Sequence, residues 1–307
     1  MGDLAVFKQC LEADDRIAVE ATGNTRFFYT QVAPLVAQCV IVNPSQFEII
    51  KQSVSKTERN DARALAQFLS KALLPTSRMK EQLQAQVSSL ANTRDKLIKL
   101  RTTLFNKIHA HLKAHGFESR KEASDHEANL VKVLRMPLPP LVLLELEVII
   151  AQIRSLRSGI QKLEAQINEL GPQLEGYQNL LSIKGIGRYS AAVLLSIIGQ
   201  ANDFADEDKL ASYFGIVPRV ANSNQTQHQG RTTKRGSKLG RTVLVQCTLT
   251  AKRYSPYLKQ YYERIKGRRG AGQAIIATAR KFLGIISRTL KHGWVFADFP
   301  NFVLAEK

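Results

Sequence analysis

Ser223 is a candidate nucleophile because it lies in the most basic part of the chain. Residues 219–291 contain seventeen lysines and arginines and one acid, Glu263, which gives this segment +16 of the chain's formal net charge of +18. A serine hydroxyl among so many cations could attack a phosphodiester whose charge those cations hold. The alternative is an ordinary loop serine. No Ser/His/Asp arrangement accompanies Ser223, although His228 is near it in the sequence.

Three acidic residues form a second candidate site. Glu20 ends the short apolar segment RIAVE, and Glu58 and Asp61 lie three residues apart at the start of a predicted helix. Carboxylates at this spacing share a helix face, and a carboxylate at a strand end can meet them across a sheet crevice. Three converging carboxylates could bind Mg²⁺ for phosphoryl transfer. The alternative is structural, because acids in the first turn of a helix interact favourably with its dipole.

The concentration of positive charge predicts a polyanionic partner, most directly nucleic acid. A solvated basic face is the alternative, but such faces usually mix both signs. The segment LLSIKGIGRYSAAVLLSIIG (180–199) adds two helices around a Gly-x-Gly turn, typical of a helix-hairpin-helix that contacts DNA phosphates through backbone N–H groups. A tight turn with purely structural glycines looks similar. The residues expected to contact nucleic acid are Lys184, Gly185, Gly187, Arg219, Arg231, Lys234, Arg235, Lys238, Arg241, Arg268 and Arg269.

Composition limits the class of protein. A length of 307 residues, 44% of them hydrophobic, suffices for about two domains with packed cores. The three cysteines, Cys10, Cys39 and Cys247, have neither zinc-ligand spacing nor a disulfide framework. The sequence has no export signal and no apolar run long enough to span a membrane. We therefore expect a reduced, cytoplasmic protein without membrane association.

The elements that would position these residues change in character along the chain. Residues 17–20 and 39–42 predict two short buried parallel strands joined by a helical stretch, and both end in polar residues, Glu20 and Asn43. Leucines then recur every seven residues from Leu83 to Leu104. After the segment MPLPP, a cleaner series with alternating steps of three and four runs from Leu146 to Leu174.

The two heptad series predict a pair of long helices joined around residues 116–140. The helices should pack as an antiparallel coiled-coil hairpin or against another subunit; an internal bundle without a partner is the alternative. The chain then divides into an α/β domain (1–76), a helical hairpin (77–176) and a mainly α-helical carboxy-terminal domain (177–307). The predicted fold class is α/β plus α.

Seven segments, in order along the chain, resemble the DEDD-type insertion-sequence transposases related to the Piv DNA invertase. They are VEATGN (19–24), VNPSQF (42–47), KTERNDARALA (56–66), LLSIKGIGRYSAAVLLSIIG (180–199), DF (203–204), LASYFGIVPR (210–219) and GRTTKRGSKLGR (230–241). The resemblance covers nearly the whole chain. It implies that residues 1–76 form part of a RuvC-like, RNase H-type domain.

The family resemblance also implies roles for the candidate residues. Four acids of such proteins bind magnesium, and Glu20, Glu58 and Asp61 match the second, third and fourth of them. Ser223 matches the serine that forms a covalent link to a DNA phosphate. Members of the family work as oligomers, here a dimer or tetramer through the heptads, and better-understood members use a guide RNA. The expected location is the bacterial nucleoid.

The chain departs from the family pattern in three places. Glu58 stands where the family has aspartate, and its extra methylene moves the ligand by roughly an ångström, enough to disturb near-octahedral magnesium. Asn224 stands where glycine is common. Only nineteen residues precede Glu20, and they predict a helix followed by the strand. The family's opening strands and first aspartate are therefore expected to be missing, which would leave an apolar sheet edge.

These observations predict a DNA transposase or site-specific recombinase that uses Ser223, assisted by Mg²⁺. A second hypothesis is a catalytically inactive, truncated transposase that only binds DNA or guide RNA, with steeply salt-dependent affinity and no magnesium requirement. A third is a helix-hairpin-helix repair factor that prefers branched DNA.

Overall fold

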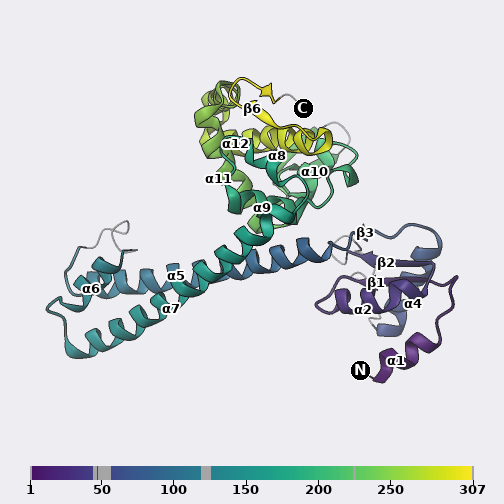
Figure 1. The fold of residues 1–307 in the computed structure, drawn as a ribbon, viewed down its shortest axis with the longest axis horizontal. Helices are drawn as coiled ribbons and strands as arrows, with labels where there is room; N and C mark the ends of the chain where they lie inside the picture. The colour runs from purple at the N-terminus through teal and green to yellow at the C-terminus, as the bar shows by residue number, and fades with distance from the viewer. Residues whose placement is uncertain (1, 44–46, 48–56, 119–125, 224–225, 306–307) are drawn as a thin grey trace. The chain divides into compact units, whose positions relative to one another are not determined.

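The described part of the chain is mainly helical with three small sheets, in agreement with the predicted α/β plus α class. The computed structural model shown in Figure 1 describes residues 2–43, 47, 57–118, 126–223 and 226–305. The chain separates into two compact units, which we call unit 1 (Met1–Lys80) and unit 2 (Glu81–Lys307). The boundary between them lies near the predicted end of the α/β domain.

Unit 1 is built on a three-stranded sheet with the order β1-β2-β3. Its elements are α1 (Gly2–Gln9), β1 (Arg16–Glu20), α2 (Thr25–Val32), η1 (Ala33–Leu35), β2 (Gln38–Val42), α4 (Glu58–Ser70) and β3 (Thr76–Ser77). β1 and β2 are parallel, with Glu20 opposite Val42, and β3 is antiparallel to β2. Each of the two predicted strands is confirmed and begins one residue earlier than expected. Within the described residues, β1 has a strand partner on one side only.

A local hydrogen-bond network fixes the polar end of β1. The Thr25 hydroxyl donates to the backbone carbonyl of Glu20 at 2.8 Å and accepts from the backbone N–H of Thr22 at 2.6 Å. The turn after the strand and the start of α2 are thereby joined. The core beneath is small: its buried cluster consists of Val40, Val42, Phe47 and Leu69.

Unit 2 begins with two long helices, α5 (Gln82–Ala114) and α7 (Pro140–Leu170), packed against each other. They are antiparallel, because Arg94 forms an ion pair with Glu164 at 2.5 Å whereas His111, farther along α5, meets Glu145, nearer the start of α7, at 3.0 Å. Within α7, residues of the predicted heptad series are buried, among them Leu146, Ile149, Ile153, Ile160 and Ile167. The predicted antiparallel hairpin therefore forms within one chain, and pairing with another subunit remains a prediction.

A small core closes the loop end of this hairpin. The helix α6 (Glu127–Leu134) packs against α7, and Leu130 joins a buried cluster that includes Ile108, Leu146 and Ile150. The pKa of the Glu127 carboxyl is lowered, chiefly by its hydrogen bond to Arg154.

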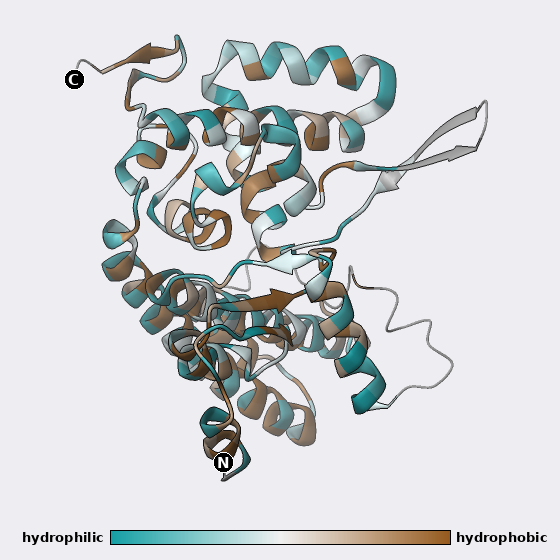
Figure 2. Cartoon of the chain, turned by 90° about the vertical axis from the view of Figure 1, so that its right-hand side faces the viewer, coloured by the Kyte–Doolittle hydropathy of each residue, from teal (hydrophilic) through white to brown (hydrophobic). Residues whose placement is uncertain are grey.

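The rest of unit 2 surrounds α9 (Arg188–Ile198), whose residues from Ala191 to Ile198 are all buried. Its other elements are η3 (Gly171–Gln173), α8 (Tyr177–Leu181), η4 (Ala201–Asp203), α10 (Glu207–Tyr213), β4 (Pro218–Ser223), β5 (Thr226–Thr232), α11 (Lys238–Tyr254), α12 (Pro256–His292), β6 (Phe296–Asp298) and β7 (Val303–Leu304). Figure 2 shows helices that alternate between hydrophobic and hydrophilic segments, as amphipathic helices around a common core do.

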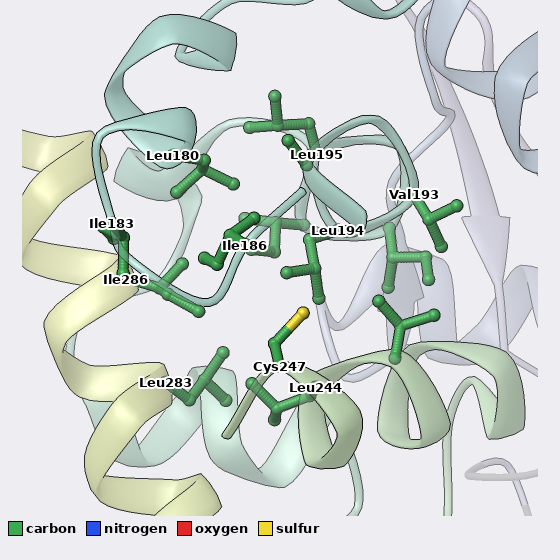
Figure 3. Packing of buried hydrophobic residues seen from close by; sticks show 14 of the residues in the cluster. Leu180, Ile183, Ile186, Val193, Leu194, Leu195, Leu244, Cys247, Leu283 and Ile286 are labelled. Atoms are coloured by element: carbon green, nitrogen blue, oxygen red, sulfur yellow. The ribbon is translucent and has the colours of Figure 1, made fainter. Parts of the chain in front are cut away.

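Side chains from four helices meet in this core. In Figure 3, Leu194 of α9 lies among Leu244 and Cys247 of α11, Leu283 of α12 and Leu180 of α8. Burial raises the pKa of the Cys247 thiol. The cluster also includes Val87 of α5 and Ile167 of α7, so one core joins the base of the hairpin to the carboxy-terminal helices.

Candidate nucleic-acid interface and active-site residues

Ser223 is the last residue of β4, at the end of a two-stranded antiparallel ribbon. It is paired with Thr226 of β5, and a register irregularity lies between Pro218 and Val220. The β4–β5 ribbon is a sheet of its own and pairs with no other strand in the described part of the chain. The Ser223–Thr226 pair is therefore the last described pair of the ribbon. The side chain of Ser223 and the whole of Asn224 lie outside the described part.

The ribbon was not predicted, because its residues 221–229 are almost all polar and lack the hydrophobic alternation of a half-buried strand. The weak signal in the sequence was the polar turn-forming run Asn222–Asn224 between two longer segments. The expectation of a loop around Ser223 was thus wrong in local geometry.

The base of the ribbon is held by contact between two loop backbones. The N–H of Lys234 donates to the carbonyl of Gly215 at 3.0 Å, and the N–H of Thr233 donates to that of Val217 at 2.9 Å. Gly215 has φ 67°, and a Cβ there would come within 1.8 Å of the Arg235 carbonyl oxygen. Only glycine permits this approach, so the glycine in YFGIV fixes where the basic segment that follows the ribbon begins.

Arg241 stabilises the same region from α11. Its Nη1 donates to the carbonyls of Phe214 at 3.2 Å and Gly236 at 3.1 Å. It also donates to the Arg235 carbonyl at 3.3 Å, and burial lowers the pKa of the guanidinium. The structure therefore gives Arg241 a positioning role in this loop. Its predicted contact with phosphate remains a prediction.

Four other predicted nucleic-acid contacts are exposed around the ribbon base. They are Arg219 on β4, Lys234 and Arg235 in the loop, and Lys238 at the start of α11. The Ser237 hydroxyl caps α11 by accepting from the N–H of Gly240 at 3.0 Å. These positions gather cations at the ribbon base and the first turn of one helix. The side chain of Arg231 lies outside the described part.

The predicted Gly-x-Gly turn joins α8 to α9. Gly185 has φ 112°, and a Cβ there would lie 2.6 Å from the backbone nitrogen of Ala251 in α11. Close packing therefore explains this glycine. Gly187, by contrast, has open space where a Cβ would stand, and Lys184 is exposed. Contact of this turn with DNA remains a prediction, supported at Lys184 and Gly187 by their accessibility.

Arg268 and Arg269 are exposed just before a break in α12. Gly270 has φ 78° and ψ 166°, values outside the helical region, so α12 consists of two helical pieces. We did not predict this kink. The signal was GRRGAG (267–272), three glycines within an otherwise helical pattern.

The three predicted acids lie on two elements of unit 1 that pack against each other, β1 and α4. Glu20 ends β1 and is half-buried. Glu58 is the first residue of α4 and is exposed, whereas Asp61, one turn later, is half-buried. The Thr57 hydroxyl caps this helix by accepting from the N–H of Asn60 at 3.3 Å.

These oxygen donors have the chemistry that a hard divalent cation prefers. In the described parts of the chain, however, no group of three His, Cys, Asp or Glu side chains is placed to hold a metal ion. The sequence therefore predicted suitable donors on neighbouring elements, and the structure does not show them as an assembled site.

Two further findings bear on the class of protein. Cys10, Cys39 and Cys247 are all free thiols, exposed, half-buried and buried respectively. Within the residues that the structure describes, none of the helices has both the length and the apolar content needed to cross a membrane.

Comparison with known sequences identifies the family. Residues 5–116 match the sequence model of the DEDD-type IS110 transposase, and residues 177–263 match that of the "Transposase IS116/IS110/IS902 family". The two matches together span more than half of the chain.

Named relatives agree with both matches. The chain is 26% identical to the "Transposase for insertion sequence element IS1111A" of Coxiella burnetii over 281 residues, which is 88% of this chain and 76% of the relative. It is 26% identical to a "Probable family 20 transposase" of Pseudomonas aeruginosa, over 75% of this chain and 69% of the relative. A relative from Yersinia enterocolitica, the "Transposase for insertion sequence element IS1328", is 24% identical over 75% of this chain and 69% of the relative. The chain belongs to the IS116/IS110/IS902 family of insertion-sequence transposases.

Proposed function

We propose that this transposase cleaves and rejoins DNA through a covalent link between Ser223 and a DNA phosphate. The observation that carries the proposal is the position of Ser223 at the end of the β4–β5 ribbon, whose base is surrounded by exposed cations. Because the chain belongs to a family of transposases, the proposed substrate is DNA. A hydroxyl at the end of a ribbon can approach one phosphate of a DNA strand that cations on the ribbon base hold at other phosphates.

The chemistry conserves the number of phosphodiester bonds. The Ser223 oxygen attacks phosphorus and forms a serine–phosphate bond, while the bond to one deoxyribose oxygen breaks and that oxygen leaves as a hydroxyl with a proton. A hydroxyl of the second DNA then attacks the same phosphorus and releases serine. Each step exchanges one phosphodiester for another, so the reaction needs no external energy source.

The carboxylates of unit 1 are proposed to assist this reaction. Glu20, Glu58 and Asp61 would hold Mg²⁺, which when bound would polarise the scissile phosphate. Support comes from the DEDD-type match over residues 5–116 and from the contact between β1 and α4. Replacement of Asp61 by asparagine should abolish magnesium-dependent cleavage and leave DNA binding unchanged.

The proposed partners are the element's two ends, a target DNA, a guide RNA and further copies of the chain. The support for the guide RNA is the concentration of charge in residues 219–291, which suits any polyanion. The support for a dimer or tetramer is the long α5–α7 hairpin. Because the proposed substrate is DNA, the proposed location of the protein is the bacterial nucleoid.

Strand exchange on a defined substrate tests the proposal. Purified protein would be mixed with end-labelled DNA carrying an element end, a transcript of the flanking non-coding region and Mg²⁺. We expect the Ser223→Ala variant to bind DNA but to yield no joined product. Thr226→Ala is the matched control, because Thr226 is the cross-strand neighbour of Ser223 and should not be required. Full strand exchange by Ser223→Ala would refute the proposal.

A specific observation favours a second candidate, a catalytically inactive transposase that only binds nucleic acid. The described residues contain no assembled group of three metal-binding side chains, and Glu58 replaces the expected aspartate. Such a protein would bind DNA or RNA without magnesium and give no exchange under any condition. The same assay, performed with and without magnesium, separates the two candidates.

A further inference from the structure

A cleft of about 760 Å³ opens in unit 2 between the base of the β4–β5 ribbon, α10 and α12. Its apolar side chains, which we call the apolar wall, include Ile216 and Pro218 at the ribbon base and Ile276 on α12. Cations from two parts of the chain complete the lining: Lys234 in the loop beside the ribbon, and Arg269, Arg280 and Lys281 on α12. The cleft therefore joins an apolar wall to a row of positive charges.

Both acidic side chains that line this cleft form ion pairs with arginines. Asp208 pairs with Arg280 at 2.7 Å, and Glu207 pairs with Arg288 at 2.5 Å. Gly284 makes room for this arrangement, because a Cβ there would lie 2.3 Å from the Glu207 carboxylate. The neutralised acids leave a surplus of positive charge in the cleft.

Three of the cleft's cations carry that surplus. Lys234, Arg269 and Lys281 have no carboxylate partner in the part of the chain that the structure describes. Lys234 and Lys281 come from opposite sides of the cleft, the ribbon base and α12. A ligand between them would meet cations from both walls, so its charge is expected to be negative.

The break at Gly270 places an aromatic ring in the same cleft. Tyr261 precedes the break and Gln273 follows it, and both line the cleft together with Arg269. A second hollow of about 280 Å³ shares these three residues and adds Arg264, whose guanidinium carbon lies 5.3 Å from the centre of the Tyr261 ring. The bend thus joins an aromatic surface to phosphate-binding side chains.

We propose that this cleft binds an unpaired nucleic-acid strand, with a base against Tyr261 and the apolar wall and phosphates on Lys234, Arg269 and Lys281. Proteins bind single strands by this combination of stacking aromatics and a basic groove. A duplex keeps its base faces inside the stack, so it would leave the ring and the apolar wall unused. The inference rests on the proposed function for the source of the strand.

The ribbon sets the distance between this cleft and the proposed nucleophile. Pro218 lines the cleft, and Ser223 lies five residues farther along β4. At about 3.4 Å per residue the two are about 17 Å apart. A stacked strand advances about 3.4 Å per nucleotide, so a strand that follows the ribbon from Pro218 to Ser223 would span about five nucleotides.

Two glycines of α12 offer a matched test that leaves the charge unchanged. Gly272 lines the cleft and Gly267 does not, and a Cβ at either position would meet no atom within 4 Å. Neither has a positive φ, so Gly272→Trp fills the cleft whereas Gly267→Trp adds the same side chain outside it. Circular dichroism and thermal unfolding of both full-length variants would confirm that they fold.

Affinity would be measured by fluorescence anisotropy with a labelled 15-nucleotide single-stranded DNA, its RNA counterpart and the corresponding DNA duplex. Stacking of one base contributes about 1–3 kcal/mol, so we expect Gly272→Trp to weaken single-strand binding by about 5- to 150-fold. Duplex affinity should stay unchanged, and Gly267→Trp should affect neither. A preference for DNA or for RNA would identify the source of the strand. Equal losses for single strand and duplex, or no loss for single strands, would overturn the inference.

A second pair of variants separates stacking from charge. Tyr261→Leu should weaken single-strand binding without changing its salt dependence, whereas Arg269→Gln should reduce the salt slope by about one. Lys259→Gln is the charge control, because Lys259 is exposed on α12 and lies outside the cleft lining. Equal effects of Arg269→Gln and Lys259→Gln on the single strand would contradict a specific role for the cleft.

Failure of this inference can be told from failure of the proposed function. If Gly272→Trp selectively weakens single-strand binding while no serine–DNA link forms, the cleft is established and the proposed chemistry is wrong. If the link forms and Gly272→Trp leaves single-strand binding unchanged, the cleft proposal alone is wrong.

Discussion

Unit 1 and unit 2 differ in net charge and in the size of the buried hydrophobic core. Unit 1 has ten basic and eight acidic residues, whereas almost the whole net charge of +18 belongs to unit 2. Among the residues that the structure describes, the buried cluster of unit 1 has four members, Val40, Val42, Phe47 and Leu69, and the main cluster of unit 2 has thirty-one. The unit expected to bind the polyanion is therefore also the one with the packed scaffold that can hold a ribbon in position.

The contrast suggests a division of work between the units. The acids of unit 1 lie at the surface ends of elements over a small core, a setting in which local structure is easily perturbed. The basic residues Lys234 and Arg235 of unit 2 lie in a loop that direct backbone contacts fix, as between Gly215 and Lys234. DNA binding should therefore depend on unit 2, and unit 1 should affect the chemistry more than the affinity.

The largest expected effect is a loss of stability when a buried side chain in the core of unit 2 is truncated. Leu194 is fully buried, so Leu194→Ala should lower the free energy of unfolding by about 2–5 kcal/mol through lost burial and a cavity. Urea unfolding followed by fluorescence would measure it, because the single tryptophan, Trp294, lies in unit 2. Leu100→Ala is the control, since Leu100 is 54% exposed and should change stability little. A similar loss for both variants would contradict the assignment of the core.

A smaller effect distinguishes the two glycines of the turn between α8 and α9. Gly185→Ala should destabilise unit 2 by about 1–3 kcal/mol, because alanine disfavours φ 112° and its Cβ would meet Ala251. Gly187→Ala should leave stability nearly unchanged. If Gly187→Ala nevertheless weakened binding to DNA in the anisotropy assay, the predicted phosphate contact at this turn would gain direct support. Equal stability for both variants would mean that packing does not explain Gly185.

The smallest expected effect is the change in the salt dependence of DNA affinity when one surface charge is removed. Lys238→Gln should reduce the slope of log affinity against log salt by about one, because one phosphate contact is lost. Arg63→Gln in unit 1 is the comparison, since Arg63 is also an exposed helical cation. Titrations of duplex DNA at several salt concentrations should show no change for Arg63→Gln. A reduced slope for both variants would extend the DNA-binding surface into unit 1.

The sequence predicted those parts of the fold that follow from local hydrophobic patterns. The strands ending at Glu20 and Val42 were correctly placed because both are short apolar runs with polar ends. The α5–α7 hairpin followed from heptads, although heptads could not show that α7 packs on a helix of its own chain. Capped starts of helices, as at Thr57, were equally accessible to sequence reasoning.

The parts that sequence reasoning missed depend on contacts between distant segments. The β4–β5 ribbon is polar, and its base is fixed by the approach of Gly215 to the Arg235 backbone, which no local pattern reveals. The same holds for the structural role of Arg241, which donates to carbonyls from two loops. The kink at Gly270 had a local signal, but the cleft that it lines did not.

The most direct test of the account identifies the atom that is joined to DNA. The complex of protein, element-end DNA and Mg²⁺ would be denatured, treated with nuclease and trypsin, and analysed by mass spectrometry. Cleavage after Arg219 and Arg231 should release the peptide VANSNQTQHQGR, in which fragmentation distinguishes Ser223 from Thr226. The account predicts a nucleotide on Ser223. A nucleotide on any other residue, or strand exchange without a covalent protein–DNA link, would contradict it.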